Sequence, residues 1–135
     1  MSSIVNPTPA SPSPPDRVSI PLVQHRTTDG SAFTLLSVAV PANSALKIVI
    51  DLTAKQSGGT KAMSWLLVMS YVSDGSSLTR MMTTMANPFY VANNGAPFWS
   101  YSWNDATGLT ASLVIQGWSG ETVDWSATGH YNYAP

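Results

Sequence analysis

Residues 109–133, "LTASLVIQGWSGETVDWSATGHYNY", form two alternating segments on either side of a glycine-containing turn. In both segments every second residue is apolar or aromatic, and the residues between them are mostly small and polar. A period of two is typical of β-strands with one buried face. We therefore expect two strands here, whose inward residues are Leu109, Ala111, Leu113, Ile115, Val123, Trp125, Ala127, Gly129, Tyr131 and Tyr133.

The same kind of pattern extends upstream. Residues 45–54, "ALKIVIDLTA", alternate clearly, with Leu46 and Ile50 on the predicted inner face and Lys47 on the outer face. Residues 62–72, "AMSWLLVMSYV", are apolar at most positions, which predicts a central strand covered on both faces. Further strands are expected at 19–24, 32–40 and 97–103.

Two of the expected strands carry special features. Pro21 lies inside residues 19–24, and because proline cannot donate a ladder hydrogen bond, this segment is expected to be an edge strand or a first strand. Residues 78–86, "LTRMMTTMA", have apolar residues at helical spacing but three threonines that favour a strand. We predict a strand there, with a short helix as the alternative.

About eight short strands with turns rich in Gly, Asn and Ser predict an all-β fold. We expect an antiparallel β-sandwich of jelly-roll type over residues 18–135. Residues 1–17 are expected to form a separate, extended, proline-rich N-terminal arm.

Composition excludes several function classes. Charged residues make up only 10% of the chain, with six Lys and Arg against seven Asp and Glu. A nucleic-acid-binding protein would carry a basic stripe, and no apolar run approaches the length of a membrane-spanning helix. The chain has no cysteine and no signal-peptide pattern, so we expect synthesis in a cytosol. Such an uncharged surface is tolerable where neighbouring subunits cover it.

We find no catalytic or metal-binding pattern and predict that the chain is not an enzyme and has no cofactor. His25 and His130 lack the neighbours of a metal site and are expected to be exposed surface residues. Four scattered carboxylates could supply a glycosidase pair, but turns and strand ends account for them: Asp51, Asp105, Glu121 and Asp124.

The aromatic residues allow two interpretations. Trp99, Tyr101 and Trp103 share one predicted strand face, and such a row is usually a core face, although carbohydrate-binding proteins stack sugars on similar rows. Trp118 differs because it lies in a turn flanked by glycines. It is either a contact residue or a lid folded onto the domain. Trp99, Trp103 and Trp118 are therefore the candidate aromatic contacts.

The arm contains five prolines within residues 6–17, "NPTPASPSPPDR". Such a segment favours the polyproline II conformation and buries little apolar surface. It is either a linker or a clasp that reaches a neighbouring subunit. Under the second interpretation the partner-binding residues are Pro7, Pro9, Pro12, Pro14, Pro15 and Arg17.

The stretch from Gly108 to Tyr133 resembles the ends of structural β-sandwich proteins of tailed bacteriophages, both head decoration proteins and tail-fibre modules. The shared form is an alternating strand, a Gly-x-x-Gly turn and a strand containing tryptophan, here Gly117, Gly120, Thr122, Val123 and Trp125. The resemblance implies a virion protein with a sandwich or jelly-roll fold, assembled in the cytoplasm of an infected bacterium. It transfers no active site.

These observations together predict a capsid decoration (cement) protein. Its partners would be the major capsid protein or other virion subunits, with homo-oligomerisation and neither nucleic acid nor membrane involved. The alternative is a tail-fibre or receptor-binding module that stacks glycans on exposed aromatic residues.

Overall fold

The computed structural model describes residues 17–81, 89–93, 99–106 and 108–134, with residues 89–93 described by their backbone alone. The strands in this part of the chain are β1 (Val18–Thr27), β2 (Ala32–Ala39), β3 (Ala45–Gln56), β4 (Ala62–Ser73), β5 (Leu78–Arg80), β6 (Phe89–Asn93), β7 (Ser100–Asn104), β8 (Thr110–Gln116) and β9 (Val123–Ala134).

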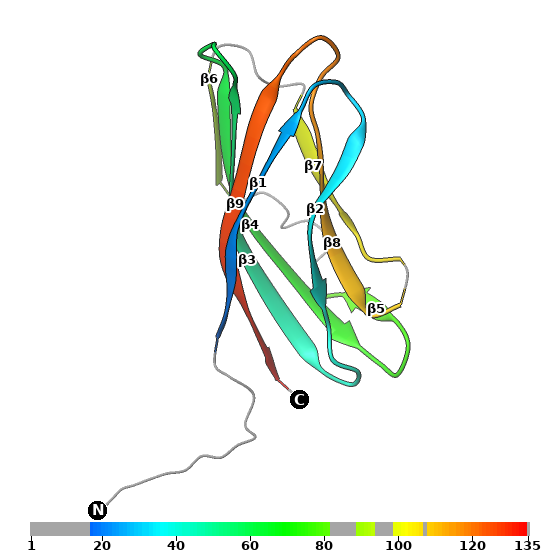
Figure 1. Cartoon of the computed structure of the whole chain (residues 1–135). Helices are drawn as coiled ribbons and strands as arrows, with labels where there is room; N and C mark the ends of the chain where they lie inside the picture. Colours follow the sequence, from blue (N-terminus) through cyan, green and yellow to red (C-terminus); the bar gives the residue numbers. More distant parts are fainter. Residues whose placement is uncertain (1–16, 82–88, 94–98, 107, 135) are drawn as a thin grey trace, which may run out of the picture.

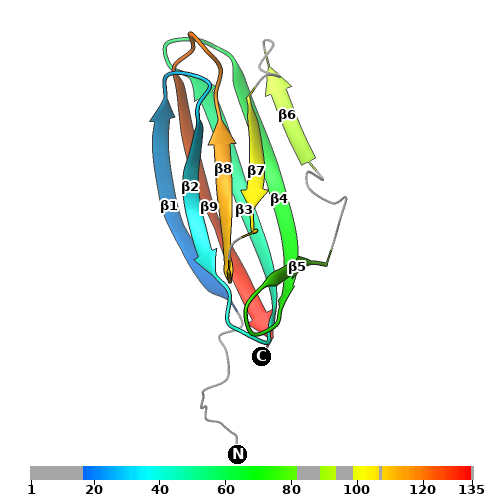
Figure 2. The ribbon, with the colours of Figure 1, turned by 90° about the vertical axis from the view of Figure 1, so that its right-hand side faces the viewer.

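The strands form two antiparallel sheets that face each other (Figures 1 and 2). The larger sheet has the order β1-β9-β3-β4-β5, with β6 also paired to β4, and the smaller sheet has the order β2-β8-β7. The all-β, antiparallel sandwich predicted from the sequence is confirmed. The first two strands pair with the last two, β1 with β9 and β2 with β8, as in the wrapped pairing of a jelly roll. By contrast, β3 and β4 pair as a hairpin within the larger sheet.

Alternation places the predicted core residues correctly. Leu46, Ile48, Ile50 and Leu52 of β3 are all buried, whereas Lys47 and Asp51 are exposed on the outer face. The inward residues Ala111, Leu113 and Ile115 of β8 are also fully buried and face the larger sheet. Burying a strand face in this way removes apolar surface from water, which is the main contribution to the stability of the sandwich.

The edge position predicted for Pro21 is confirmed, because β1 is the outermost strand of the larger sheet. The register between β1 and β9 shifts between Ile20 and Val23, so Pro21 lies in a β-bulge. A proline at an edge and in a bulge costs no ladder hydrogen bond and hinders pairing with another chain along that edge.

Strand β4 is central in its sheet, but the prediction that it is covered on both faces is wrong. Its inward residues from Met63 to Tyr71 are buried, whereas outward Leu66 and Val68 are half-buried and Val72 is exposed. A short loop after Ser73 leads from β4 into β5 at Leu78–Arg80. This agrees with a strand at the start of the segment 78–86, and residues 82–86 lie outside the described residues.

Strands β8 and β9 belong to different sheets, so the segment between them crosses from one sheet to the other. It does so at the same end of the sandwich as the loop between β1 and β2 (Figure 1). Strand β1 begins and β9 ends at the opposite end. Within the described residues no helix has the length and apolar character needed to cross a membrane.

Candidate functional site

The segment after β8 forms a tight turn that carries Trp118. The Glu121 amide donates a hydrogen bond to the Trp118 carbonyl over 3.1 Å, which closes a four-residue turn. Gly120 occupies its third position with φ 81°, the left-handed conformation that a type II turn requires there and that glycine adopts without strain. The turn therefore places Trp118 at the end of the sandwich.

Gly117 allows this turn to approach the β1–β2 loop closely. A Cβ atom at Gly117 would lie 2.6 Å from Thr27 Oγ1 and 3.0 Å from the Asp29 carbonyl oxygen. The opposite loop is shaped by Asp29, whose Oδ1 accepts a hydrogen bond from the Ser31 amide at 2.8 Å. Gln116 Nε2 joins the two loops by donating to the Gly30 carbonyl over 2.8 Å.

Between these loops and the start of β7 lies a groove of about 370 Å³, which we call the Trp118 groove. The side chain of Trp118 is 45% exposed in it. Among the described residues, its lining comprises one aromatic residue, two glycines and three uncharged polar residues: Gly30, Ser100, Gln116, Gly117, Trp118 and Ser119. Such a surface offers an apolar ring and hydrogen-bonding groups without any charge.

Glu121, the last residue of the turn, holds it in place through contacts with the rest of the sandwich. Its carboxylate forms an ion pair with Lys61 and accepts a hydrogen bond from Trp99 Nε1 over 2.8 Å. These two hydrogen bonds hold the pKa of the Glu121 carboxyl below its ordinary value. The Ser57 amide also donates to the Thr122 carbonyl over 2.9 Å, so the β3–β4 loop supports the same segment.

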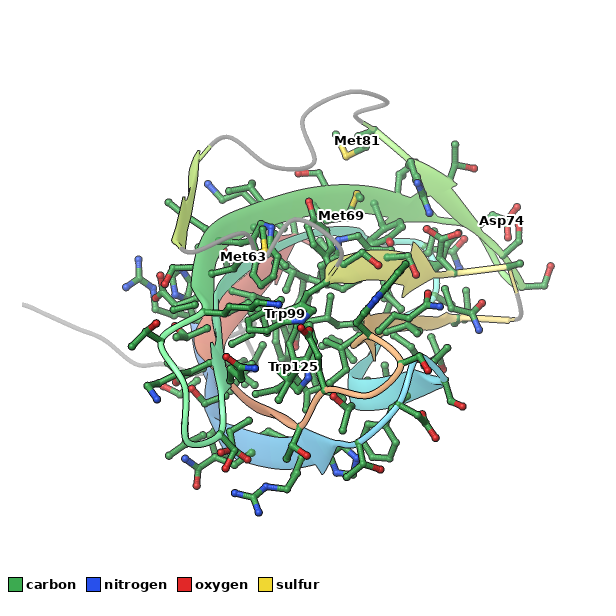
Figure 3. All side chains as sticks on the ribbon, turned by 90° about the horizontal axis from the view of Figure 1, so that it is seen from above. Met63, Met69, Asp74, Met81, Trp99 and Trp125 are labelled. Carbon is green, nitrogen blue, oxygen red and sulfur yellow. The ribbon has the colours of Figure 1, made fainter. Side chains whose placement is uncertain are left out.

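An aromatic cluster lies beneath the turn, between the two sheets (Figure 3). The rings of Trp65 and Trp125 stack with centroids 6.0 Å apart, and Trp99 lies 6.4 Å from Trp125. Trp125 Nε1 donates to Thr27 Oγ1 over 2.9 Å. Trp99, which donates a hydrogen bond to Glu121 in the Trp118 turn, is therefore part of the hydrophobic core.

The structure separates the three aromatic candidates. Trp99 is only 2% exposed and Trp103 only 8%, so both have the core placement, and neither offers an open ring face for a ligand. Trp103 Nε1 has no hydrogen-bond partner within the described residues. Trp118 is the candidate that reaches the surface. Of the proposed partner-binding arm residues, Arg17 is exposed, and Pro7, Pro9, Pro12, Pro14 and Pro15 lie outside the described residues.

The expectation that His25 and His130 are exposed surface residues is wrong for both. His25 is half-buried, and its ring stacks in parallel on Phe33 with centroids 3.5 Å apart. The stack connects β1 to β2 and so covers the open side between the two sheets. His130 is half-buried on the outer face of β9, beside Val49 in register.

Three of the four carboxylates considered for a glycosidase pair, Asp105, Glu121 and Asp124, have separate partners. Asp124 binds the Arg26 guanidinium at 2.7 and 3.1 Å, and next to this pair lies a shallow depression of about 450 Å³. Asp105 accepts hydrogen bonds from Tyr71 at 2.8 Å and from Arg80 at 2.6 Å. Among the described residues, no three of His, Cys, Asp and Glu gather closely enough to hold a metal ion.

Sequence reasoning missed most of the groove. Alternation in the sequence singles out none of Ser100, Gln116 and Gly30 as binding residues. The Gly-Trp-Ser-Gly turn was the available signal, because a tryptophan between glycines has no local residues to bury it. The β1–β2 loop, the Trp118 turn and the start of β7 come together only because strands far apart in the sequence pair with one another.

No protein-family model matches the sequence, and no curated protein matches it either. Among solved structures, the chain is similar to the tailspike protein of Acinetobacter phage vB_ApiP_P1, with 16% identity and a TM-score of 0.45 over 99% of this chain and 24% of that one. It is also similar to tailspike protein gp49 of Acinetobacter baumannii bacteriophage Fri1, a capsular polysaccharide depolymerase, with 16% identity and a TM-score of 0.32. That likeness covers 89% of this chain and 22% of the tailspike, so the chain spans less than a quarter of either tailspike's length.

Proposed function

We propose that this chain is a structural subunit of a bacteriophage virion that packs against other subunits. The observation that carries the proposal is the absence of charge from the smaller sheet. None of the residues in β2, β8 or β7 is charged. The outward face of this sheet is made of small and uncharged side chains: Thr34, Ser37, Ala39, Ser100, Ser102, Asn104, Thr110, Ser112, Val114 and Gln116.

The contrast with the larger sheet supports this proposal. Its outer face carries Lys47, Asp51, Lys55 and Asp124. Protein interfaces are depleted of charged residues at their centres, whereas free edge strands usually carry lysine or proline to prevent association. Edge strand β1 has such protection through Pro21, but β2 and β7, the edges of the smaller sheet, have neither residue type. A subunit covered by neighbours has no need of that protection.

Within a virion we place the subunit on the head, as a decoration protein held by its sandwich and arm. The partners under this proposal are the major capsid protein and further copies of the chain. The strand, turn and tryptophan pattern around Gly117 and Trp125, which resembles phage structural proteins, agrees with either a head or a tail position. The chain is proposed to act by binding and not by catalysis.

One observation favours a second candidate, a tail-fibre or receptor-binding module. Trp118 is exposed in its groove at the end of the sandwich opposite the start of β1 and the end of β9. A module attached by those ends would present the Trp118 groove outwards, where an indole ring can stack on a sugar. In this case the ligand would be a glycan of the host surface.

Labelling of purified virions tests the proposal. Virions of the phage that encodes the chain are labelled with antibodies against it and imaged by electron microscopy. Label on the head supports decoration, and binding of the protein to empty expanded capsids that lack it should follow. Label on the tail fibres supports the second candidate. A chain that is abundant in infected cells but absent from purified virions contradicts both.

A further inference from the structure

Three prolines of the arm are spaced so that their side chains would lie on the same side of a polyproline II helix. Pro9, Pro12 and Pro15 recur at every third residue. A polyproline II helix has three residues per turn, so these side chains would form one ridge along it, about 19 Å long at 3.1 Å per residue. Pro7 and Pro14 do not belong to this ridge.

The Trp118 groove has the chemistry that recognises such a ridge. Polyproline II segments bind in grooves lined by aromatic residues, where proline rings pack on the aromatic face. Their backbone carbonyls are free to accept hydrogen bonds because the helix has none of its own. Ser100, Gln116 and Ser119 place donor groups around Trp118, and none of the described lining residues is charged. The ridge itself is also uncharged.

From this match we propose that the Trp118 groove binds the proline ridge Pro9–Pro15 of a second copy of the chain. The inference rests on the proposed role as a packing subunit and names the contact through which copies join. It also gives Trp118 a protein ligand in place of a glycan.

Chain length requires the ridge to come from another copy. The groove adjoins Thr27 through Gly117, whereas the arm leaves the sandwich at Val18. These residues are nine steps apart along β1, about 30 Å at 3.3 Å per residue. Pro12, the middle of the ridge, precedes Val18 by six residues and can lie at most about 21 Å from it. The ridge therefore falls short of the groove of its own sandwich.

The contact is head-to-tail, since β1, to whose start the arm is joined, begins at the end of the sandwich opposite the connection between β8 and β9 that carries the groove (Figure 1). Contacts between two different surfaces form closed rings when the rotation between copies closes, and open chains when it does not. Each copy would give one arm and receive one. Proline reduces the number of conformations open to a free chain, so docking of a proline-rich segment would lose less conformational entropy than docking of a flexible one.

Sedimentation of the full-length protein over a range of concentrations tests the proposal. We expect wild-type protein to associate, and Trp118→Ala to weaken association at least tenfold. The triple variant Pro9→Ala, Pro12→Ala, Pro15→Ala should weaken it equally. The matched control Pro7→Ala, Pro14→Ala removes prolines outside the ridge and should associate like wild type. Val72→Ala, which shortens an exposed side chain outside the groove, should do so as well.

Mixing the two defective proteins provides the sharpest result. Trp118→Ala keeps an intact arm, and the triple proline variant keeps an intact groove. An equimolar mixture should therefore form heterodimers at concentrations where each variant alone is monomeric. A synthetic peptide of residues 1–17 should dissociate wild-type oligomers, whereas the same peptide with Pro9, Pro12 and Pro15 replaced by alanine should not. The peptide experiment uses only wild-type protein, so the test remains valid if Trp118→Ala unfolds.

Two results would overturn the proposal. One is a wild-type protein that remains monomeric at all concentrations tested, and the other is undiminished association of folded Trp118→Ala. Saturable binding of maltohexaose to the monomer, lost in Trp118→Ala, would assign the groove to carbohydrate instead. The virion labelling experiment stays independent, because a monomeric protein found in virions contradicts this inference and leaves the proposed function standing.

Discussion

The indole of Trp99 donates a hydrogen bond to the carboxylate of Glu121, with Nε1 and Oε1 2.8 Å apart. The two residues belong to different loops, one preceding β7 and the other preceding β9. Trp99 is buried in the core, and Glu121 closes the turn that exposes Trp118. The position of Trp118 is therefore coupled to core packing, which makes the Trp118 groove a preformed surface.

We expect the contribution of Glu121 to depend on pH. Its folded-state pKa is lowered by hydrogen bonds from Lys61 and Trp99, so its stabilising effect is present above the unfolded pKa of about 4.3 and is lost as pH falls through the folded value. Glu121→Gln should lower the Tm at pH 7. The difference from wild type should disappear in acid, where wild-type Glu121 is protonated as well.

Thermal melts of both proteins from pH 7 down to pH 2 measure this effect. The control is Asp51→Asn, the same chemical change on the exposed outer face of β3, which should leave the Tm nearly unchanged. A difference between Glu121→Gln and wild type that is constant over the whole pH range would show that the ion pair is not its source.

Gly117→Ala should destabilise the protein by about 1–3 kcal/mol, as expected for overpacking. The new methyl group would collide with Thr27 Oγ1 and the Asp29 carbonyl, and Thr27 Oγ1 is also the acceptor for Trp125 Nε1. Gly75→Ala is the control, since a Cβ there meets no atom within 4 Å. Urea unfolding gives both values, and equal effects would mean that the close approach of the two loops is not rigid.

Ile50→Ala should cost about 2–5 kcal/mol of unfolding free energy because it leaves a cavity in the core. Ile50 is fully buried in the middle of β3. Lys47→Ala on the opposite face of the same strand should cost little. Chemical denaturation of the two variants tests the assignment of faces, which similar losses in both would refute.

Tyr71→Phe should lower the free energy of unfolding by about 1.5–3 kcal/mol, the range for a hydrogen bond to a charged group. Its effect should be local to the end of the sandwich that lies away from the Trp118 groove. The Tyr71 hydroxyl donates to Asp105, which also binds Arg80, and Arg80 Nη2 donates to the Trp103 carbonyl over 3.2 Å. Hydrogen exchange of the 105–109 loop should accelerate, and exchange near Trp118 should not. Faster hydrogen exchange at both ends would contradict this prediction, because it would mean that the two ends open together as one cooperative unit.

Alternation in the sequence was sufficient to predict most of the strands and the two faces of β3. Leu46 and Ile50 point inwards and Lys47 outwards because successive strand residues project to opposite sides, whatever the rest of the chain does. Pro21 likewise fixed an edge strand, since a missing amide donor cannot be accommodated in a sheet centre. These properties are local, so they could be predicted without knowledge of strand order.

Only the tertiary structure decided which strands are neighbours and what gathers at their ends. Strands β8 and β9 follow each other in the sequence but belong to different sheets, and their connection becomes the turn that carries Trp118. Lys61, Trp99 and Glu121 meet from three loops, and His25 stacks on Phe33 across the open side. Alternation specifies the two faces of each strand but not its partner, because pairing depends on long-range contacts that bury all the apolar faces together.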